Sequence, residues 1–373
     1  ATDVTPLKVL ACTVAGHVIP SPMATVHEGM LTFALPPDAI RDNTILTTEF
    51  STYFGGSGIE VISGLDIDSA GYMYFSGSTS STDLPLANAW QKTHAGGISD
   101  IFIGCISPDG RSLRFMTYLG GSKLDTTDLR IDIDYMAGGF PGLKSSWMDK
   151  LRINHRTGDI YLSGHTISPD FPVTGTAIQS SLGSTFSAVI SSFSSEGSLR
   201  RSTYLGGPGN TGIASIALDK FGDVYVLGGY DSDSLWFVTK GTVQPLLKHE
   251  PAAVPWATGG FLVKICKTLD SIIWGSYFYA INGENLPDKS IGPFKLLLDS
   301  KRQPIIAGWT VEPDSSTWQA IPRVYPIGRK SNYGLPQMYL TKLTADAQGY
   351  VFSTFYGDSS TNYLTDALCD SDD

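Results

Sequence analysis

The run Ser51-Thr52-Tyr53-Phe54-Gly55-Gly56 recurs along this chain and decides its fold class. The close copies are Met116-Thr117-Tyr118-Leu119-Gly120-Gly121 and Ser202-Thr203-Tyr204-Leu205-Gly206-Gly207. Weaker copies are Gly275-Ser276-Tyr277-Phe278 and Ser353-Thr354-Phe355-Tyr356-Gly357. The Thr or Ser positions 52, 117, 203, 276 and 354 are separated by steps of 65, 86, 73 and 78 residues. A motif that returns in this way indicates a chain built from repeated structural units.

A second signature follows each of the first four copies of this motif. It consists of an apolar strand, a turn usually written Asp-x-x-Gly, and a second strand that ends in Gly. Six residues separate the turn positions, Gly71, Gly158, Gly222 and Arg302, from the strand-ending Gly77, Gly164, Gly228 and Gly308. Asp opens these turns, except in the second copy, where we assign His155 to that position. Asp favours turn formation and Gly tolerates positive φ, so the pattern predicts β-hairpins.

Two further signatures complete the repeat. One is Asp83-Leu84-Pro85 with Gln91, matched by Asp170-Phe171-Pro172 with Gln179, while the third copy keeps only Gln244. The other is a strand, a turn and a strand that leads into the next Thr-Tyr motif, with first strands expected at 101–106, 188–193, 261–266 and 338–343. Each repeat therefore encodes two hairpins, or four strands, which is the content of one β-propeller blade.

The ends of the chain predict how these blades join. Residues 364–370 align with the first strand of a fifth repeat, whereas 30–35 and 45–50 fit a third and a fourth strand and 7–13 fit a second. We therefore predict an all-β fold, a β-propeller of five four-stranded blades, closed by a blade shared between the N- and C-termini. Such closure leaves no exposed sheet edge.

This prediction divides the chain into an N-terminal arm or strand, 1–29, and a single propeller, 30–373. The expected blades are about 51–116, 117–202, 203–275 and 276–352, with the split blade made of 353–373 plus 7–50. The shared blade brings Cys12 and Cys369 together, and we predict a disulfide between them; the alternative is two free cysteines. Cys105 and Cys266 lie in apolar strands, where we expect buried free thiols.

The repeat resembles the SBBP β-propeller repeat family of secreted and surface proteins. The resemblance rests on S-T-Y-L-G-G, on a D-x-x-G-x-x-Y-V-x-G hairpin, on D-F-P and on a G-A-Y-Q-like segment. Residues 51–121 and 117–207 match best, 203–275 match moderately and 276–356 match weakly. The resemblance implies a propeller fold in a secreted protein, and it implies no particular catalytic residues.

Composition narrows the classes of function. The chain has 373 residues, is 42% hydrophobic, and carries a net charge of −10. An acidic chain lacks the basic face that phosphate contacts need, so no nucleic-acid partner is expected. No run of 18 apolar residues occurs, so no membrane span is expected either. Because the sequence opens at Ala1 with no apolar leader, we expect a mature secreted protein, extracellular or at the cell surface.

No familiar catalytic or metal motif occurs in the sequence. The six histidines show no metal-binding spacing, and His165, after Gly164, is expected at a loop surface. The Asp66/Asp68 and Asp132/Asp134 pairs could bind calcium. The alternative for Asp68 is a role in the turn, and the alternative for Asp132 and Asp134 is a solvated strand face. We therefore expect no catalytic residues, no cofactor and no metal, and not an enzyme. A pair of carboxylates from distant blades remains the alternative for glycoside hydrolysis.

Two insertions interrupt the repeat, at about 123–149 and about 311–337. They contain candidate interaction residues: Tyr135, Phe140, Trp147, Trp318, Arg323, Tyr325, Arg329 and Tyr333. Long loops on a rigid scaffold often carry function, although packing of these loops onto the scaffold is the alternative. We expect a non-catalytic extracellular structural protein that self-associates into a surface fibre or layer. The alternatives are a propeller module of a cell-surface protein that binds glycans or peptides, and a propeller glycosidase or lyase. The expected partners are further copies of the chain, other extracellular proteins or glycans.

Overall fold

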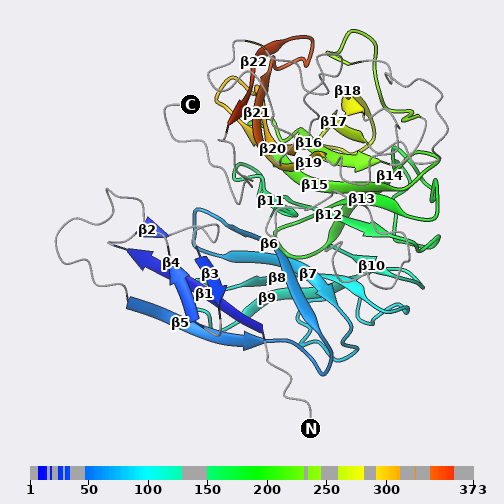
Figure 1. The fold of residues 1–373 in the computed structure, drawn as a ribbon. Helices are drawn as coiled ribbons and strands as arrows, with labels where there is room; N and C mark the ends of the chain where they lie inside the picture. Colours follow the sequence, from blue (N-terminus) through cyan, green and yellow to red (C-terminus); the bar gives the residue numbers. More distant parts are fainter. Residues whose placement is uncertain are drawn as a thin grey trace.

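The computed structural model describes residues 7–14, 17–18, 24–27, 30–33, 47–127, 149–230, 234–244, 259–280, 291–310, 324 and 337–356. Every helix or strand assigned in this part of the chain is a β-strand, which confirms the predicted all-β class. Most of these strands form four antiparallel sheets, which we call sheets I to IV, and each is a meander of consecutive strands. Figure 1 shows the sheets following one another in chain order, in a propeller-like arrangement.

Sheet I consists of β6 Glu60–Ile67, β7 Met73–Thr79, β8 Asp100–Ile106 and β9 Leu113–Leu119. Sheet II consists of β10 Asp125–Thr126, β11 Leu151–Ile153, β12 Ile160–Thr166, β13 Ser187–Phe193 and β14 Leu199–Leu205. Both β10 and β11 pair with β12, so they form one interrupted first strand. The expected insertion at about 123–149 thus overlaps this strand: β10 lies within it, and β11 follows its end.

Sheet III consists of β15 Thr211–Leu218, β16 Val224–Tyr230, β17 Gly259–Ile265 and β18 Ile272–Ala280. Sheet IV consists of β19 Ile291–Leu298, β20 Pro304–Thr310, β21 Gln337–Leu343 and β22 Tyr350–Tyr356. The four strands expected at 101–106, 188–193, 261–266 and 338–343 correspond to β8, β13, β17 and β21, which confirms these assignments.

The hydrophobic core lies between successive sheets. One cluster joins Phe115 of sheet I to Leu162 of sheet II, and another joins Ile190 of sheet II to Val226 of sheet III. A third joins Leu262 of sheet III to Ile306 of sheet IV. Strands covered on both faces need apolar or small residues at every position, and β7, β8, β12, β13 and β16 are buried throughout.

The first strands of successive sheets run side by side in the same direction. Lys150 N donates to Ser63 O, and three residues further along both strands Ile153 N donates to the Asp66 carboxylate. The sheets therefore share one orientation. The turn between the first two strands lies at one end of every sheet, whereas the loop between the second and third strands lies at the other end.

The N-terminal segments pair differently from the prediction. β1 Leu7–Val14 pairs directly with β5 Thr47–Phe54 and with β2 His17–Val18. β4 Met30–Phe33, expected beside β5, instead forms a hairpin with β3 Ala24–His27. The eight-residue β1 can form more hydrogen bonds with β5 than the four-residue β4 can. Two prolines, at positions 36 and 37, also follow β4, and proline has no N–H group to donate. Phe54 then packs against Phe75 and Phe102 of sheet I.

The Thr-Tyr motif lies at the end of the fourth strand and fastens the loop between the second and third strands. The Tyr204 hydroxyl donates to Ser168 O at 2.8 Å and accepts from Phe171 N at 3.2 Å. The Tyr118 hydroxyl makes the corresponding bonds to Ser81 O and Leu84 N. The repeated tyrosine is therefore a structural residue of each unit.

The repeated glutamine acts on the same loop. Gln91 Oε1 accepts from Gly120 N and Gln179 Oε1 from Gly206 N, at 3.1 and 2.9 Å. Thus each glutamine holds the Gly-Gly segment that leads into the next sheet. The Asp of the Asp-x-Pro signature has a similar role: Asp83 accepts from Ser57 N and Asp170 from Ser122 N.

The turns after the first strands show why the second signature contains Gly. Gly71, Gly158 and Gly222 have φ of 84°, 74° and 88°, and Arg302 takes the same conformation with φ of 66°. The assignment of His155 to the opening position of the second turn was wrong. Asn154 occupies that position: its carbonyl accepts from Gly158 N and its side chain from Arg156 N. The second turn has one extra residue, which shifted the alignment.

Candidate functional site

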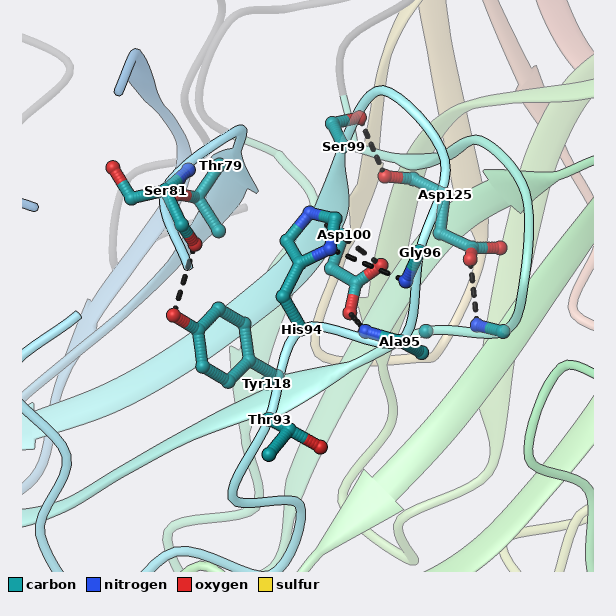
Figure 2. Close-up of polar contacts among 12 residues, drawn as sticks. Thr79, Ser81, Thr93, His94, Ala95, Gly96, Ser99, Asp100, Tyr118 and Asp125 are labelled. Atoms are coloured by element: carbon teal, nitrogen blue, oxygen red, sulfur yellow. Dashed lines mark hydrogen bonds and ion pairs between the residues drawn. The ribbon is translucent and has the colours of Figure 1, made fainter. Parts of the chain in front are cut away.

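Two buried carboxylates stand where the loop-bearing ends of sheets I and II meet, namely Asp100 and Asp125. Asp100 opens β8 and pairs with Thr79, whereas Asp125 opens the first strand of sheet II and pairs with Thr166. Ser99 connects the two sheets, because its carbonyl accepts from Asp125 N and its hydroxyl donates to Asp125 O. Figure 2 shows both carboxylates on these neighbouring segments.

Asp125 is a structural carboxylate of the repeat. It accepts hydrogen bonds from the Thr166 hydroxyl, from Gly121 N at 2.7 Å and from the Ser168 hydroxyl at 3.0 Å. Glu60 takes the same place in sheet I, where it accepts from Gly56 N and from the Thr79 and Ser81 hydroxyls. Both carboxylates thus fasten the start of a first strand to the end of the second.

Asp100 and His94 depart from the repeat. The Gln91 amide donates to Thr93 O, and the Gln179 amide donates to Ser181 O in the same way. The two loops therefore align residue by residue here, and His94 corresponds to Leu182. Asp100 pairs with Thr79, and Ser187 pairs with Thr166 at the same place in sheet II, so Asp100 is the counterpart of Ser187. Leu182 is partly buried against the core in sheet II. Sheet I has replaced an apolar residue and a hydroxyl with two titratable groups.

The two groups face each other with one polar atom of each left open. His94 Nε2 lies 3.9 Å from Asp100 Oδ1, and the side chains are 6% and 0% exposed. Neither atom makes a hydrogen bond of normal geometry to another described residue, although the Thr79 carbonyl lies near the imidazole. Asp100 Oδ2 accepts from Ala95 N at 2.7 Å and from the Gln91 amide at 3.3 Å. Figure 2 shows the imidazole and the carboxylate directed toward one another.

The bond at the other ring nitrogen sets the tautomer of His94. Gly96 N donates to His94 Nδ1 at 3.2 Å, so in the neutral ring Nε2 carries the hydrogen. The Nε2–H group is then a donor beside Asp100 Oδ1, an acceptor. A hydroxyl oxygen to one side of the line joining these two atoms, which are 3.9 Å apart, can accept from His94 and donate to Asp100 at normal hydrogen-bond distances.

Burial dominates the titration of these groups. It raises the pKa of Asp100 to about 7, against the opposing bond from Ala95 N, and the Asp125 charge adds to the rise. Burial also raises the pKa of Asp125 to about 7. For His94, burial lowers the pKa below the ordinary value, and the Thr79 carbonyl opposes this shift. Near neutral pH His94 is therefore uncharged, and Asp100 changes its protonation state.

The Asp100→Asn variant is expected to be more stable than the wild type above pH 7. Because the folded pKa is raised from 3.8 to about 7, the folded state binds more protons, and wild-type stability falls as pH rises through this window. The full difference between pH 4 and 8 is up to about 4 kcal/mol. Urea unfolding at several pH values measures it. Asp109→Asn, at an exposed turn, is the control, and parallel stability curves for wild type and Asp100→Asn contradict the expectation.

A second polar cluster joins the first strands of three sheets; we call Asp149, Arg152, Ser215 and Lys295 the Asp149 cluster. Asp149 Oδ1 accepts from Arg152 at 2.5 Å and from Lys295 Nζ at 3.0 Å, and Oδ2 accepts from the Ser215 hydroxyl at 3.0 Å. Burial acts to raise the pKa of Asp149, but the two cations hold it below its usual value. Every oxygen has a protein partner, so this cluster is structural.

His165 was expected at a loop surface, and this expectation was wrong. The side chain is fully buried in β12, stacks on Phe186 with ring centroids 5.3 Å apart, and accepts from Ile213 N at Nε2. Ser78 occupies the equivalent place in sheet I and accepts from Thr127 N. Position 165 therefore connects one sheet to the next, which the sequence pattern alone does not reveal.

The structure does not test most of the residues singled out from the sequence. Tyr135, Phe140, Trp147, Trp318, Arg323, Tyr325, Arg329, Tyr333, Asp132, Asp134, Cys369 and the side chain of Cys12 lie outside the described residues. Cys105 and Cys266 are free thiols, the first buried and the second half-buried. Asp68 accepts from Ala70 N and Tyr72 N, as a turn residue does.

The sequence analysis missed His94 and Asp100, although the signal was present. Aligning Gln91 with Gln179 places His94 opposite Leu182, and a histidine in place of a core leucine marks a departure from the repeat. The described residues contain no group of three or more His, Cys, Asp or Glu side chains arranged to hold a metal ion. They also contain no helix with the length and apolar character needed to cross a membrane.

No protein-family model and no curated protein sequence matches the chain. Among solved structures, a Hadza microbial sialidase is 8% identical with a TM-score of 0.34, over 85% of this chain and 63% of its own. A PL25 ulvan lyase is 10% identical with a TM-score of 0.35, over 87% and 63%. A GH43_12 protein retrieved from a capybara gut metagenome is 10% identical with a TM-score of 0.35, over 84% and 44%. The chain thus spans less than two thirds of each.

These similar structures correct the expected function. Most are glycoside hydrolases or polysaccharide lyases, which contradicts the expectation of a non-catalytic structural protein that self-associates into a fibre or layer. The low identities and TM-scores identify no catalytic residue of this chain. Its chemistry must therefore be argued from its own residues.

Proposed function

We propose that this chain is an enzyme in which Asp100 acts as a general base and His94 positions the oxygen that loses its proton. One observation carries the proposal: His94 Nε2 and Asp100 Oδ1 face each other at 3.9 Å, buried, and neither makes a hydrogen bond of normal geometry to another described residue. Buried polar groups normally have partners, so an open donor and an open acceptor side by side fit a shared hydroxyl oxygen.

The chemistry follows from the roles of the two atoms. The hydroxyl oxygen, from water or from a substrate, accepts from His94 Nε2–H and donates its proton to Asp100 Oδ1. A base with a pKa of about 7 suits this step at neutral pH, since it is available unprotonated and still accepts a proton readily. When this oxygen belongs to water, it bonds to an acyl or glycosyl carbon while the bond from that carbon to the leaving oxygen or nitrogen breaks. The proton that Asp100 has taken can then pass to the leaving group, directly or through water. We therefore propose hydrolysis as the reaction class.

Access to the pair requires a movement of the loop that covers it. Residues 92–99 connect Gln91 to β8, and Gly96 and Gly97 within them adopt φ of 138° and 69°. A Cβ on Gly97 would lie 2.2 Å from Lys123 O, so the loop packs closely on the segment that leads into sheet II. Opening of such a loop is a common way to admit a substrate and then exclude water.

The experiment compares wild type, Asp100→Asn, His94→Gln and the control Asp109→Asn on polysaccharides, peptides and esters, with detection of new reducing ends, amines and acids. Asp100→Asn is expected to lower turnover about 100-fold and His94→Gln about 10-fold, with the control unchanged. Wild-type kcat/KM is expected to rise with pH through an apparent pKa near 7. Wild-type turnover in Asp100→Asn, or no turnover by the wild type on any substrate, overturns the proposal.

For the scaffold, we propose a closed propeller of five blades. In the sheet of order β2-β1-β5, β5 takes the position of the fourth strand of a blade. We propose that residues 364–370 supply the first strand of this blade. The hairpins common to all repeats support membership of the SBBP type, and secretion agrees with a Cys12–Cys369 disulfide. A non-reducing peptide map tests this closure: a cross-linked Cys12–Cys369 peptide is expected, and two unlinked peptides exclude the disulfide.

A further inference from the structure

Four cations and an exposed aromatic ring gather at the end of the sheets opposite His94. The turn between β15 and β16 contributes Lys220 and Phe221, and the turn between β11 and β12 contributes Arg156. Arg302 comes from the turn between β19 and β20, and Lys267 follows β17. We call these five residues the basic turn patch.

Contacts hold the patch together across three sheets. Arg156 Nη1 donates to Lys220 O at 3.2 Å. The Arg302 guanidinium lies 5.1 Å from the centroid of the Phe221 ring, and Lys220 Nζ lies 5.6 Å from it. A Cβ on Gly222 would lie 3.7 Å from Lys267 Cβ, so Lys267 borders the same turn. The patch is therefore one continuous surface, formed because the turns after the first strands lie side by side.

The patch retains its positive charge at the surface. Among the described residues no carboxylate lies within 4.0 Å of these four cations, and the neighbouring Asp219 and Asp223 both pair with Lys264. Phe221 remains 51% exposed. The whole chain has a net charge of −10, so a surface with four cations that lack a close carboxylate in the described part of the chain is distinctive. Such a surface attracts an anionic partner through complementary charge.

We propose that the basic turn patch binds an acidic polysaccharide that contains uronic acid. Arg302 and Lys220 lie 5.1 and 5.6 Å from the Phe221 centroid, so a ligand that uses them together with the ring must present an anionic group and an apolar face within a few ångström. A uronic acid has both in one ring, because its C–H face can stack on Phe221 while its carboxylate meets Arg302 or Lys220. Arg forms paired hydrogen bonds with a carboxylate, which adds direction to the attraction.

Polygalacturonate is the test ligand, with neutral dextran and polyglutamate as comparisons, in isothermal titration at about 50 and about 300 mM salt. The charge variant combines Arg156→Ala, Lys220→Ala and Arg302→Gly, the last chosen because Gly suits φ of 66°. The control combines Lys92→Ala, Arg111→Ala and Lys123→Ala, which removes three exposed cations elsewhere. A separate Phe221→Ser variant removes the ring without changing charge.

Wild type and control are expected to bind polygalacturonate equally, more weakly at the higher salt, and not to bind dextran. The charge variant is expected to bind about tenfold more weakly, and Phe221→Ser about threefold. Undiminished binding by the charge variant, no binding by the wild type, or tighter binding of polyglutamate overturns the proposal. Binding at this surface is independent of turnover at His94 and Asp100, so the two proposals can fail separately.

Discussion

Replacing Asp149 with alanine is expected to lower the free energy of unfolding by about 3–5 kcal/mol. The carboxylate accepts from Arg152, Lys295 and Ser215, which belong to three successive sheets. Its removal takes a counter-charge from Lys295, which is only 4% exposed, and a buried cation that loses its anion costs more than a surface ion pair contributes. Urea unfolding followed by tryptophan fluorescence measures the change.

Asp159→Ala is the matched control for this prediction. Asp159 also pairs with an arginine, Arg200, but these side chains are 25% and 57% exposed. An exposed pair contributes about 0–1 kcal/mol, so the control should unfold almost like the wild type. Asp149→Asn adds a second comparison, because it retains the approximate shape and removes the charge. If Asp149→Ala costs no more than Asp159→Ala, the Asp149 cluster does not hold the sheets together.

The second large effect is expected at Gly228, where alanine should cost more than about 3 kcal/mol or prevent folding. An added Cβ would lie 2.2 Å from Gly212 O and 2.5 Å from Phe261 Cζ. The backbone carbonyl belongs to the adjacent strand and cannot rotate away as a side chain can. Gly77 in sheet I has the same surroundings, with Val61 O at 2.0 Å and Phe102 Cζ at 2.7 Å.

Gly175→Ala is the control for Gly228→Ala. Gly175 is exposed, and nothing lies within 4 Å of the position of its Cβ, so its substitution should change stability by less than about 0.5 kcal/mol. Soluble yield, circular dichroism and urea unfolding are compared for both variants and the wild type. If the Gly228→Ala protein is as stable as Gly175→Ala, β15 and β16 can separate without loss of stability. The close approach of Gly228 to Gly212 O is then not essential.

Much of each sheet was predictable because its signals are local. The turn glycines, the strand-ending glycines and the strands after them need only the conformational preferences of a few consecutive residues. The Thr-Tyr motif also located the fourth strands correctly. The assignment of His155 failed because one extra residue in the second turn is invisible in the spacing from turn Gly to strand Gly.

The candidate site could be predicted only in part. The replacement of a leucine by His94 was visible in the repeat, but its approach to Asp100 depends on how the loop before β8 folds back. The Asp149 cluster was hidden for a different reason: Asp149 ends a segment that breaks the repeat, and its partners Ser215 and Lys295 lie 66 and 146 residues further along the chain. No short sequence pattern connects residues so far apart.

By itself the sequence determined the all-β class, the succession of double hairpins and the structural turn residues, because backbone preference and burial on both faces of a strand act over a few neighbouring residues. The tertiary structure alone decided which strand pairs with β5, which side chains link one sheet to the next, and that His94 and Asp100 meet. These features depend on distances between segments far apart in the chain, and packing of whole sheets sets those distances.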